Sequence, residues 1–220
     1  MVCKVRPEKS DPKRTRVAIG SNRITYPGNV GIPTASLELA KLVFNSILSR
    51  PGAKFTTFDI CNFYLQTPFD RPEYVRVGLS NIPDEFVQEY NLLAYTRNGW
   101  VYFEIRRSVY GLPQSGMLSK NLLEQRLNKA GYYQCPTTPS IWRHKWRPIL
   151  FCLIVDDSGI EYFGKHLDDH LRNILLKHYE LTQDWSGSRF ANIDLTWDYT
   201  NRTFRLSIKH YIKKPPPSKM

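Results

Sequence analysis

Apolar residues recur along this chain in two rhythms, one with the period of a helix and one with the period of a strand. The helical rhythm is clearest in 115–130, where Gly131 is placed to end the helix, and it is also present in 34–48 and 165–179. Strands are predicted, in chain order, at 55–60, near Val75, and at 101–105, 149–155, 160–163, 190–197 and 204–208. The pattern therefore predicts a chain that mixes helices and strands.

Turn and breaker residues connect these elements. Residues 156–159 predict a tight turn between two strands, which gives a hairpin with acids at its tip. The prolines of 68–83 are typical of an irregular connection, and 11–25 has the pattern of a short exposed hairpin rich in basic residues. Three consecutive prolines, Pro215 to Pro217, mark the expected end of the folded chain.

The order of the elements predicts the fold class. From residue 55 onward the order is β-α-β-β-α-β, with 190–197 as the last strand. This order indicates an α+β fold of the ferredoxin-like split βαβ kind, one antiparallel sheet with both helices packed on one face. Two neighbouring strand ends would then bring Asp59 close to Asp156 and Asp157. Because like charges repel, such a cluster needs cations in the site, and the sequence therefore predicts a metal centre.

The net charge of the chain limits the classes of partner that we expect. Its 220 residues are 41% hydrophobic, enough to bury a core, and 31 basic against 20 acidic side chains leave a formal charge of +11. Such an excess favours a polyanion, either nucleic acid or an anionic membrane surface, through the release of counterions. The longest purely apolar run, 149–155, is far shorter than the roughly 20 residues of a spanning helix, so we expect no membrane insertion.

The cysteines bear on the compartment. Cys3, Cys61, Cys135 and Cys152 lack the paired spacing of a metal site, and no secretory signal precedes them. We therefore expect reduced thiols in an intracellular protein, cytoplasmic or nuclear and not secreted.

Three short motifs carry more information together than any of them alone. They are Phe58-Asp59-Ile60-Cys61-Asn62-Phe63-Tyr64-Leu65, Tyr110-Gly111-Leu112-Pro113-Gln114-Ser115-Gly116 and Leu153-Ile154-Val155-Asp156-Asp157. In order and spacing they resemble the motifs of reverse transcriptases from copia-type (Pseudoviridae-like) retrotransposons. With Arg71 to Val75 and Leu206 to Ile212, the resemblance covers roughly residues 12 to 213.

The resemblance implies a reverse-transcriptase palm with partial fingers and an absent or incomplete thumb. Residues 1–52 would be the N-terminal part of the fingers, with the basic hairpin and the first helix. Residues 53–212 would be the palm, with an inserted fingers segment at about 66–110, and 213–220 a disordered tail. The chain would then be a fragment of a polyprotein that also carries integrase and ribonuclease H.

The resemblance also implies an activity, RNA-directed DNA polymerisation on an RNA or DNA template with a primer and deoxynucleoside triphosphates. Asp59 and Asp156 would bind two Mg²⁺ ions, with Mn²⁺ as an alternative, and Asp157 would complete the cluster. Two such ions, about 3.5 to 4 Å apart, activate the primer 3′-hydroxyl and stabilise the leaving pyrophosphate. Hard carboxylate oxygens suit Mg²⁺.

Four further residues acquire roles through the resemblance. Tyr64 lies where the family carries an aromatic residue that excludes a ribose 2′-hydroxyl, and Gln114 where a residue lies against the incoming nucleotide and template. Arg16 and Arg23 are candidates to grip the triphosphate through paired N–H groups. Without the resemblance, Tyr64 would be a core residue, Gln114 a helix cap, and either arginine a solvated surface charge.

The sequence departs from the family pattern at four positions. Cys61 stands where lysine is usual, Ile154 where an aromatic residue is usual, Ser115 where alanine is usual, and Asn192 near an expected glycine. None of these removes a carboxylate, but they keep open a catalytically inactive, nucleic-acid-binding remnant. A metal-dependent nuclease is a further alternative, because two-metal sites also cleave phosphodiesters.

One pair of histidines suggests a second metal site. His166 and His170 are four residues apart on the predicted helix, a spacing that suits a transition metal. They share a polar face with Asp168 and Asp169, opposite Leu171, and a solvated stripe is the preferred interpretation.

Overall fold

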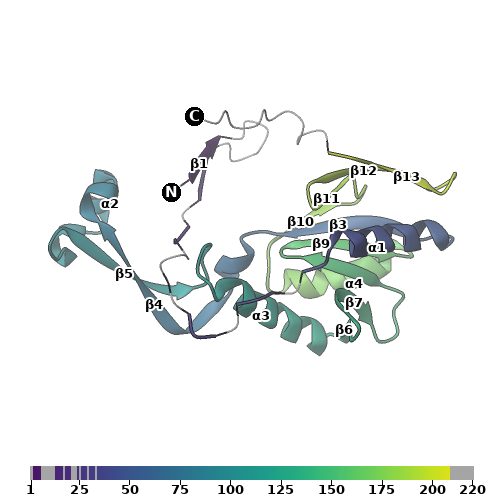
Figure 1. Cartoon of the computed structure of the whole chain (residues 1–220), viewed down its shortest axis with the longest axis horizontal. Coiled ribbons are helices and arrows are strands. Elements are labelled where there is room, and N and C mark those ends of the chain that lie inside the picture. The colour runs from purple at the N-terminus through teal and green to yellow at the C-terminus, as the bar shows by residue number, and fades with distance from the viewer. Residues whose placement is uncertain are drawn as a thin grey trace. The chain divides into compact units, whose positions relative to one another are not determined.

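The computed structural model (Figure 1) describes residues 34–208 and, before them, 2–5, 13–16, 18–20, 24, 26–28 and 30–32, without Pro33. Of 2–5 and 13–16 only the backbone is described. The chain forms two compact units, each built from two stretches of sequence. The first unit combines Met1–Asn29 with Tyr64–Leu118, and the second combines Val30–Phe63 with Ser119–Met220.

The second unit is built on a six-stranded antiparallel sheet with the strand order β10-β3-β9-β8-β7-β6. Its strands are β3 (Lys54–Ile60), β6 (Tyr132–Cys135), β7 (Thr138–His144), β8 (Leu150–Ile154), β9 (Asp157–Tyr162) and β10 (Leu181–Asp184). The four strands β10, β3, β9 and β8, with one helix after β3 and another after β9, follow the order of a split βαβ unit. Strands β7 and β6, which the sequence analysis missed, extend the sheet beyond β8.

The last strand of the sheet is not the one predicted. The sequence analysis assigned it to 190–197, whereas β10 (Leu181–Asp184) fills that place by pairing with β3. Residues 189–207 instead form a separate three-stranded sheet of β11 (Arg189–Phe190), β12 (Ile193–Asp198) and β13 (Thr203–Ser207). Its second hairpin turns near Asn201, as predicted, where the Asp198 carboxylate accepts hydrogen bonds from the backbone and side-chain N–H groups of Asn201 at 2.9 and 2.8 Å.

Helix α1 (Leu37–Ser49) covers one face of the sheet. Ser36 caps its first turn by accepting a hydrogen bond from the backbone N–H of Leu39, at 3.3 Å. The sequence analysis grouped this helix with residues 1–52, but its buried side chains pack in one core cluster with Phe55 of β3 and Cys152 of β8. Phe44, fully buried, is the centre of that cluster.

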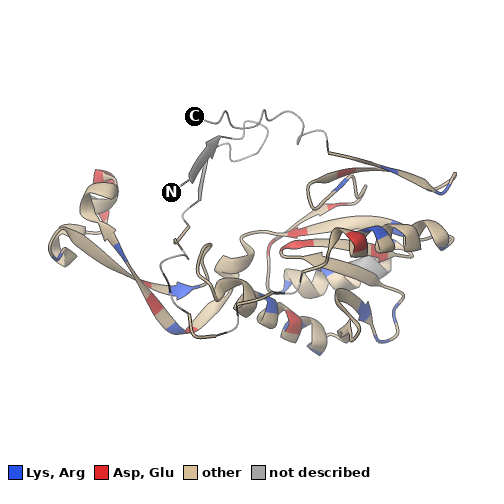
Figure 2. Ribbon diagram, viewed as in Figure 1, with Lys and Arg blue, Asp and Glu red and all other residues tan. Residues whose placement is uncertain are grey.

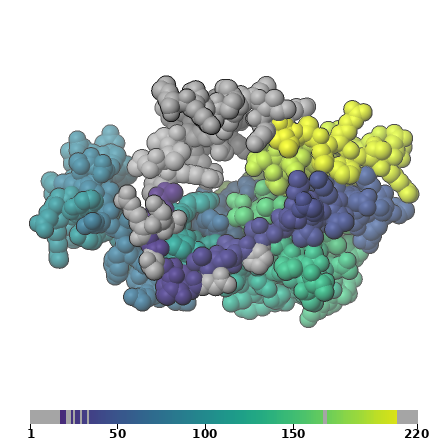
Figure 3. Space-filling model, in the orientation of Figure 1, coloured from purple at the N-terminus to yellow at the C-terminus, as the bar shows by residue number. Residues whose placement is uncertain are grey.

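The small C-terminal sheet closes the same core. The ring of Phe44 meets those of Phe55, Phe190, Trp197 and Phe204 edge to face, with centroids between 5.3 and 6.2 Å apart. Such aromatic contacts stabilise the core beyond the area that they bury. Figure 3 shows the yellow C-terminal strands lying against the dark blue helix α1.

Two helices cover the opposite face. Successive residues of a strand point to opposite faces, so Phe151 lies on the face away from Cys152. The ring of Phe151 contacts Tyr132, and the Tyr132 hydroxyl bonds to His170 of α4 (Lys165–Leu176) at 2.9 Å. Helix α3 (Ser115–Lys129) lines one cavity together with α4. Both α3 and α4 were predicted from their periodicity, within one to three residues at their ends.

The first unit is built on a two-stranded ribbon of β4 (Pro68–Gly78) and β5 (Trp100–Arg107). The pairing near Val75 and 101–105 was predicted, but 68–83 was expected to be irregular and is mostly strand. A register shift between Pro68 and Glu73 accommodates the prolines, because a two-stranded ribbon leaves one side of each strand unpaired. Short helices follow: η3 (Leu79–Asn81), α2 (Asp84–Glu89) and η4 (Leu92–Tyr95).

The predicted basic hairpin at 11–25 differs from the structure. Its first arm is strand β2 (Lys13–Arg16), but β2 pairs with β1 (Val2–Val5), which precedes it in the chain. The turn residues Ser21 and Asn22 lie outside the described residues, as does the tail 213–220.

Two further expectations concern the described part of the chain. No helix there is both long and apolar enough to cross a bilayer. Cys61, Cys135 and Cys152 are free thiols, and burial raises the pKa of Cys152 to about 12.

Candidate metal centre

Strand pairing brings the ends of β3 and β9 together. Asp59, near the end of β3, is the register partner of Asp157, the first residue of β9. The backbone N–H of Ile60 donates to the carbonyl of Asp156 at 3.2 Å, which ties the end of β3 to the β8–β9 turn. Three acids that are distant in sequence therefore meet at one edge of the sheet.

The β8–β9 turn is shorter than predicted. The sequence analysis placed a turn at 156–159, but Ile154 already pairs with Asp157, so only Val155 and Asp156 form the turn. Val155 has φ of 60°, a conformation that is unfavourable for a β-branched residue. The turn therefore holds Asp156 at the tip of the hairpin at a cost in backbone strain.

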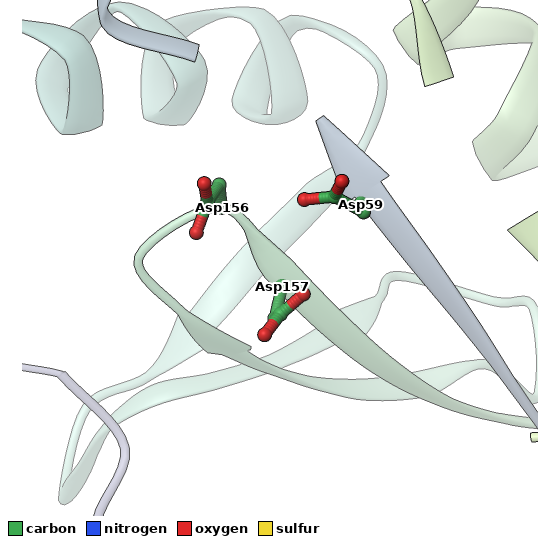
Figure 4. A group of neighbouring side chains, drawn as sticks. All are labelled: Asp59, Asp156 and Asp157. Atoms are coloured by element: carbon green, nitrogen blue, oxygen red, sulfur yellow. The ribbon is translucent and has the colours of Figure 1, made fainter. Parts of the chain in front are cut away.

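The three carboxylates form one cluster (Figure 4). One carboxylate oxygen from each of Asp59, Asp156 and Asp157 lies within 4.8 Å of the others. Asp59 is exposed, and Asp156 and Asp157 are half-buried. Among the described residues no other set of three or more His, Cys, Asp or Glu side chains has this proximity.

The electrostatics of the cluster are unfavourable for three negative charges. The pKa of Asp157 is raised to about 6, first by burial and then by the charges of Asp156 and Asp59. Arg189 and a hydrogen bond from the backbone N–H of Ala191 act in the opposite direction. A divalent cation would relieve this repulsion, and a set of hard oxygen ligands open to solvent on one side fits Mg²⁺.

Arg189 was not identified from the sequence. It lies on β11, whose hairpin with β12 turns through Ala191 and Asn192, both with positive φ, and so brings a cation toward Asp157. No spacing relative to the acids marks this arginine, because its approach depends on the packing of the small C-terminal sheet. Its guanidinium also bonds to the side-chain oxygen of Asn192 at 3.4 Å.

Tyr64 and Gln114 lie in the first unit, so their arrangement with the carboxylates stays a prediction. Tyr64 is half-buried on a turn of 3-10 helix, η2 (Phe63–Gln66), and its ring packs against Tyr110 with centroids 4.9 Å apart. Gln114 is almost completely buried, and its Nε2 donates to the carboxylate of Glu73 at 2.9 Å. The side-chain oxygen of Gln114 is buried and has no hydrogen-bond partner among the described residues.

The conformation of the loop before Gln114 explains why its motif contains Gly111. Gly111 has φ of 90°, and a Cβ there would collide with the backbone of Ile19. The backbone N–H of Ile19 donates to the carbonyl of Tyr110 at 2.9 Å. Only glycine therefore allows this segment to approach the loop.

The other proposed site residues are described less fully. The backbone of Arg16 pairs with Val2 in the β1–β2 hairpin, and Arg23 lies outside the described residues. The role of both arginines stays a prediction.

The histidine pair is not a simple solvated stripe. His170 bonds through Nδ1 to the hydroxyl of Tyr132 at 2.9 Å, and its ring lies 5.3 Å from that of His144. His166 is exposed. One nitrogen of His170 is thus engaged in packing the helix on the sheet.

Comparison with known proteins adds a weak likeness. No protein-family model matches this chain, and the search of curated proteins found no match. Telomerase from Candida albicans, in complex with a fragment of telomeric RNA, aligns with 73% of this chain at 14% identity and a TM-score of 0.41. Two structures of apo telomerase from Candida tropicalis, one truncated from its C-terminal domain, align with 80% and 79% at 13% identity and TM-scores of 0.42 and 0.40. The chain spans 32 to 40% of those telomerase chains.

Proposed function

We propose that this chain is part of a reverse transcriptase, an RNA-directed DNA polymerase from a copia-type retrotransposon. The observation that supports this most is the cluster of Asp59, Asp156 and Asp157 at the end of a split βαβ sheet. The resemblance of three sequence motifs to those of reverse transcriptases indicates polymerase chemistry. Strand pairing explains why two of those motifs, the one with Asp59 and the one with Asp156 and Asp157, lie together.

In this proposal Asp59 and Asp156 hold two Mg²⁺ ions, with Asp157 beside them. When bound, the ions would activate the primer 3′-hydroxyl and stabilise the leaving pyrophosphate. The carboxylates would fix the position of the ions, because Asp59 is anchored on β3 and the other two on the short turn into β9. Arg189, near Asp157, would offer a positive charge to the phosphates of the nucleotide at the edge of this site.

The first unit would supply the pocket for the nucleotide. Tyr64, packed on Tyr110, would exclude the ribose 2′-hydroxyl, and Gln114 would support the pocket from its buried position against Glu73. Arg16 and Arg23 would contact the triphosphate. The partners are a primer on an RNA or DNA template and deoxynucleoside triphosphates, in the cytoplasm or the nucleus, and integrase and ribonuclease H would lie elsewhere in the polyprotein.

The experiment that tests this function is incorporation of labelled deoxynucleotides on an RNA template with a DNA primer, with Mg²⁺ or with EDTA. The native chain and Asp156→Asn are compared. We expect Mg²⁺-dependent incorporation by the native chain, and its loss in the variant because a metal ligand is missing. Asp169→Asn, on α4 at the other face of the sheet, is the matched control and should behave as the native chain does.

The outcome also distinguishes the alternatives. If neither the native chain nor the variant incorporates nucleotides while salt-sensitive nucleic-acid binding is retained, the chain is an inactive remnant and the polymerase proposal fails. Mg²⁺-dependent cleavage of the template without incorporation would instead identify a nuclease.

A further inference from the structure

A cavity of about 430 Å³ opens between α3 and α4. Its polar lining consists of Arg126, Lys129, His170, Asn173, Lys177 and His178. Helix α4 reaches the sheet on the face of Phe151, whereas Asp59 and Asp157 lie on the face of α1, because Asp157 and Glu161 alternate with the residues that face α4. The cavity and the carboxylate cluster are therefore on opposite faces of the sheet.

The lining is positively charged. Among the residues that the structure describes, it contains three permanent cations, Arg126, Lys129 and Lys177, and no acid. None of these three side chains forms an ion pair in the described part of the chain. The ion pairs found there join Arg50 to Glu161 and Arg106 to Glu104. Figure 2 marks basic positions along α3. Three unpaired cations around one cavity repel each other, and this arrangement favours an anion between them.

The cations converge on the histidines of the cavity. The pKa of His178 is lowered first by burial and then by Arg126, Lys177 and Lys129. The pKa of His170 is lowered by burial and by charges that include Lys177. Positive charge from Arg126 and Lys129 of α3 and from Lys177, directly after α4, therefore acts on the histidines that line the cavity.

Arg126 has a donor whose hydrogen bonding is incomplete. Its guanidinium lies over the ring of Tyr179, 4.8 Å from the centroid, and its charge acts to lower the pKa of the Tyr179 hydroxyl, which burial raises. The guanidinium also acts on the Tyr179 hydroxyl as a side-chain hydrogen-bond donor, but neither Arg126 Nη1 nor that hydroxyl completes a hydrogen bond of good geometry among the described residues. A buried donor with incomplete hydrogen bonding is unfavourable, so Arg126 is a candidate to bond an added acceptor.

We propose that this cavity binds a phosphate-bearing anion, held by Arg126, Lys129 and Lys177. The planar guanidinium offers parallel N–H donors to phosphate oxygens, and the two lysines add charge from the rim. The phosphate can come from a free oligophosphate or from the backbone of a nucleic acid. This site is independent of the carboxylate cluster and needs no metal.

The test is calorimetric titration of the full chain with inorganic tripolyphosphate. EDTA is present, so that no metal is available to the carboxylate cluster or to tripolyphosphate. We expect binding that weakens as salt is raised and that depends largely on Lys129 and Lys177. The double variant Lys129→Gln with Lys177→Gln should weaken it about tenfold or more, because two charge-assisted contacts are lost. The control is Lys41→Gln with Lys54→Gln, exposed lysines on α1 and β3, which removes the same charge and should leave affinity unchanged. Equal affinity in the variant and the control would overturn the proposal.

A second variant excludes an effect of misfolding. Asn173→Lys adds a cation at an exposed position of the lining and should tighten tripolyphosphate binding several-fold, which an unfolded protein does not do. Unchanged or weaker binding by this variant would count against the site.

Competition identifies the source of the phosphate. A short single-stranded oligonucleotide that displaces tripolyphosphate from the native chain, and itself binds more weakly to the lysine double variant, indicates a nucleic-acid backbone. Tripolyphosphate binding that the oligonucleotide does not disturb indicates a free oligophosphate. Either result leaves the polymerase proposal untouched, because the metal-free titration does not depend on it.

Discussion

The two ends of strand β9 each carry an acid on the same face of the sheet, and the two acids have opposite surroundings. Glu161 is fully buried but paired, with Arg50 Nη1 at 2.8 Å and the hydroxyl of Ser46 at 2.9 Å, both donors from the α1 region. Asp157 is only half-buried, yet its closest charged neighbours include two other acids. Both acids lie in one strand, so the difference comes from the partners that the fold provides.

The comparison separates an acid with a structural partner from an acid that is a candidate metal ligand. A buried carboxylate with two donors is already satisfied and has nothing to offer a cation. Asp157 is short of positive charge, since Arg189 opposes only part of the repulsion. The pKa of Asp157 therefore stays near 6. The protein therefore supplies the positive charge for one end of β9 by itself and leaves the other end short of it.

Neutralising a carboxylate of the cluster should have the largest effect on activity, whereas neutralising Glu161 should have little. We expect Asp59→Asn to lower Mg²⁺-dependent incorporation by at least about 100-fold, because a metal ligand is worth several kcal/mol of transition-state stabilisation. Glu161→Gln should keep the rate per folded molecule, since the amide can still bond to Arg50 and Ser46. Primer extension on an RNA template measures both, and a comparable loss in the two variants would remove the distinction between the carboxylate cluster and Glu161.

Removing the partner of Glu161 should have the largest effect on stability. Arg50→Met leaves a fully buried carboxylate with Ser46 as its remaining side-chain partner, which we expect to lower the free energy of unfolding by about 2 to 3 kcal/mol. Urea denaturation measures this, with Arg205→Met, an exposed arginine on β13, as the control. A loss no larger than that of the control would show that Glu161 does not depend on its ion pair.

Neutralising Asp157 should raise the stability of the folded chain, in contrast to Arg50→Met. Its pKa is higher in the folded chain, about 6, than the 3.8 of an unperturbed carboxyl, so its favourable contribution is complete below about pH 4 and is lost as the pH rises through 6. Asparagine cannot ionise. In EDTA at pH 8 we therefore expect Asp157→Asn to be more stable than the native chain by on the order of 1 kcal/mol, after allowance for solvent screening. Thermal unfolding from pH 4 to pH 8 tests this, and a gain that is the same at both ends would contradict it.

The turn that holds Asp156 should give the smallest effect. Val155→Gly relieves the positive φ but frees the unfolded chain, and we expect a net gain in stability of about 0.5 kcal/mol. Val75→Gly, in the middle of β4, should lower stability, since glycine weakens a strand. Chemical denaturation of both variants measures the difference, and destabilisation by Val155→Gly would mean that the valine side chain packs more favourably than its backbone is strained.

The sequence predicted the elements whose apolar residues keep a clear period. Helix α3 begins at Ser115 as predicted, and strand β8 lies within the expected 149–155. Strand β7 was missed because its buried pair, Ile141 and Trp142, is flanked by Pro139 and charged residues, which hides any alternation. Strand β10 has one apolar residue in four and is defined by its pairing with β3, an interaction that no local pattern reveals.

The candidate site divides in the same way. The cluster of three carboxylates was predicted because strand order alone brings their positions together. The buried contact between Gln114 and Glu73 was not, since the two residues are 41 positions apart and neither is apolar. The approach of Arg189 also escaped prediction, because it depends on a separate sheet that the sequence analysis merged with the first.

The interleaving of the two units has a consequence for dissecting this protein. The chain enters the second unit at Val30, leaves it at Phe63 and returns at Ser119, so each unit is discontinuous in sequence. No single truncation or proteolytic cut can release either unit whole. An isolated fragment with the carboxylate cluster would have to splice 30–63 directly to 119–208, whereas a chain cut between the units would yield pieces that must reassociate to restore either one.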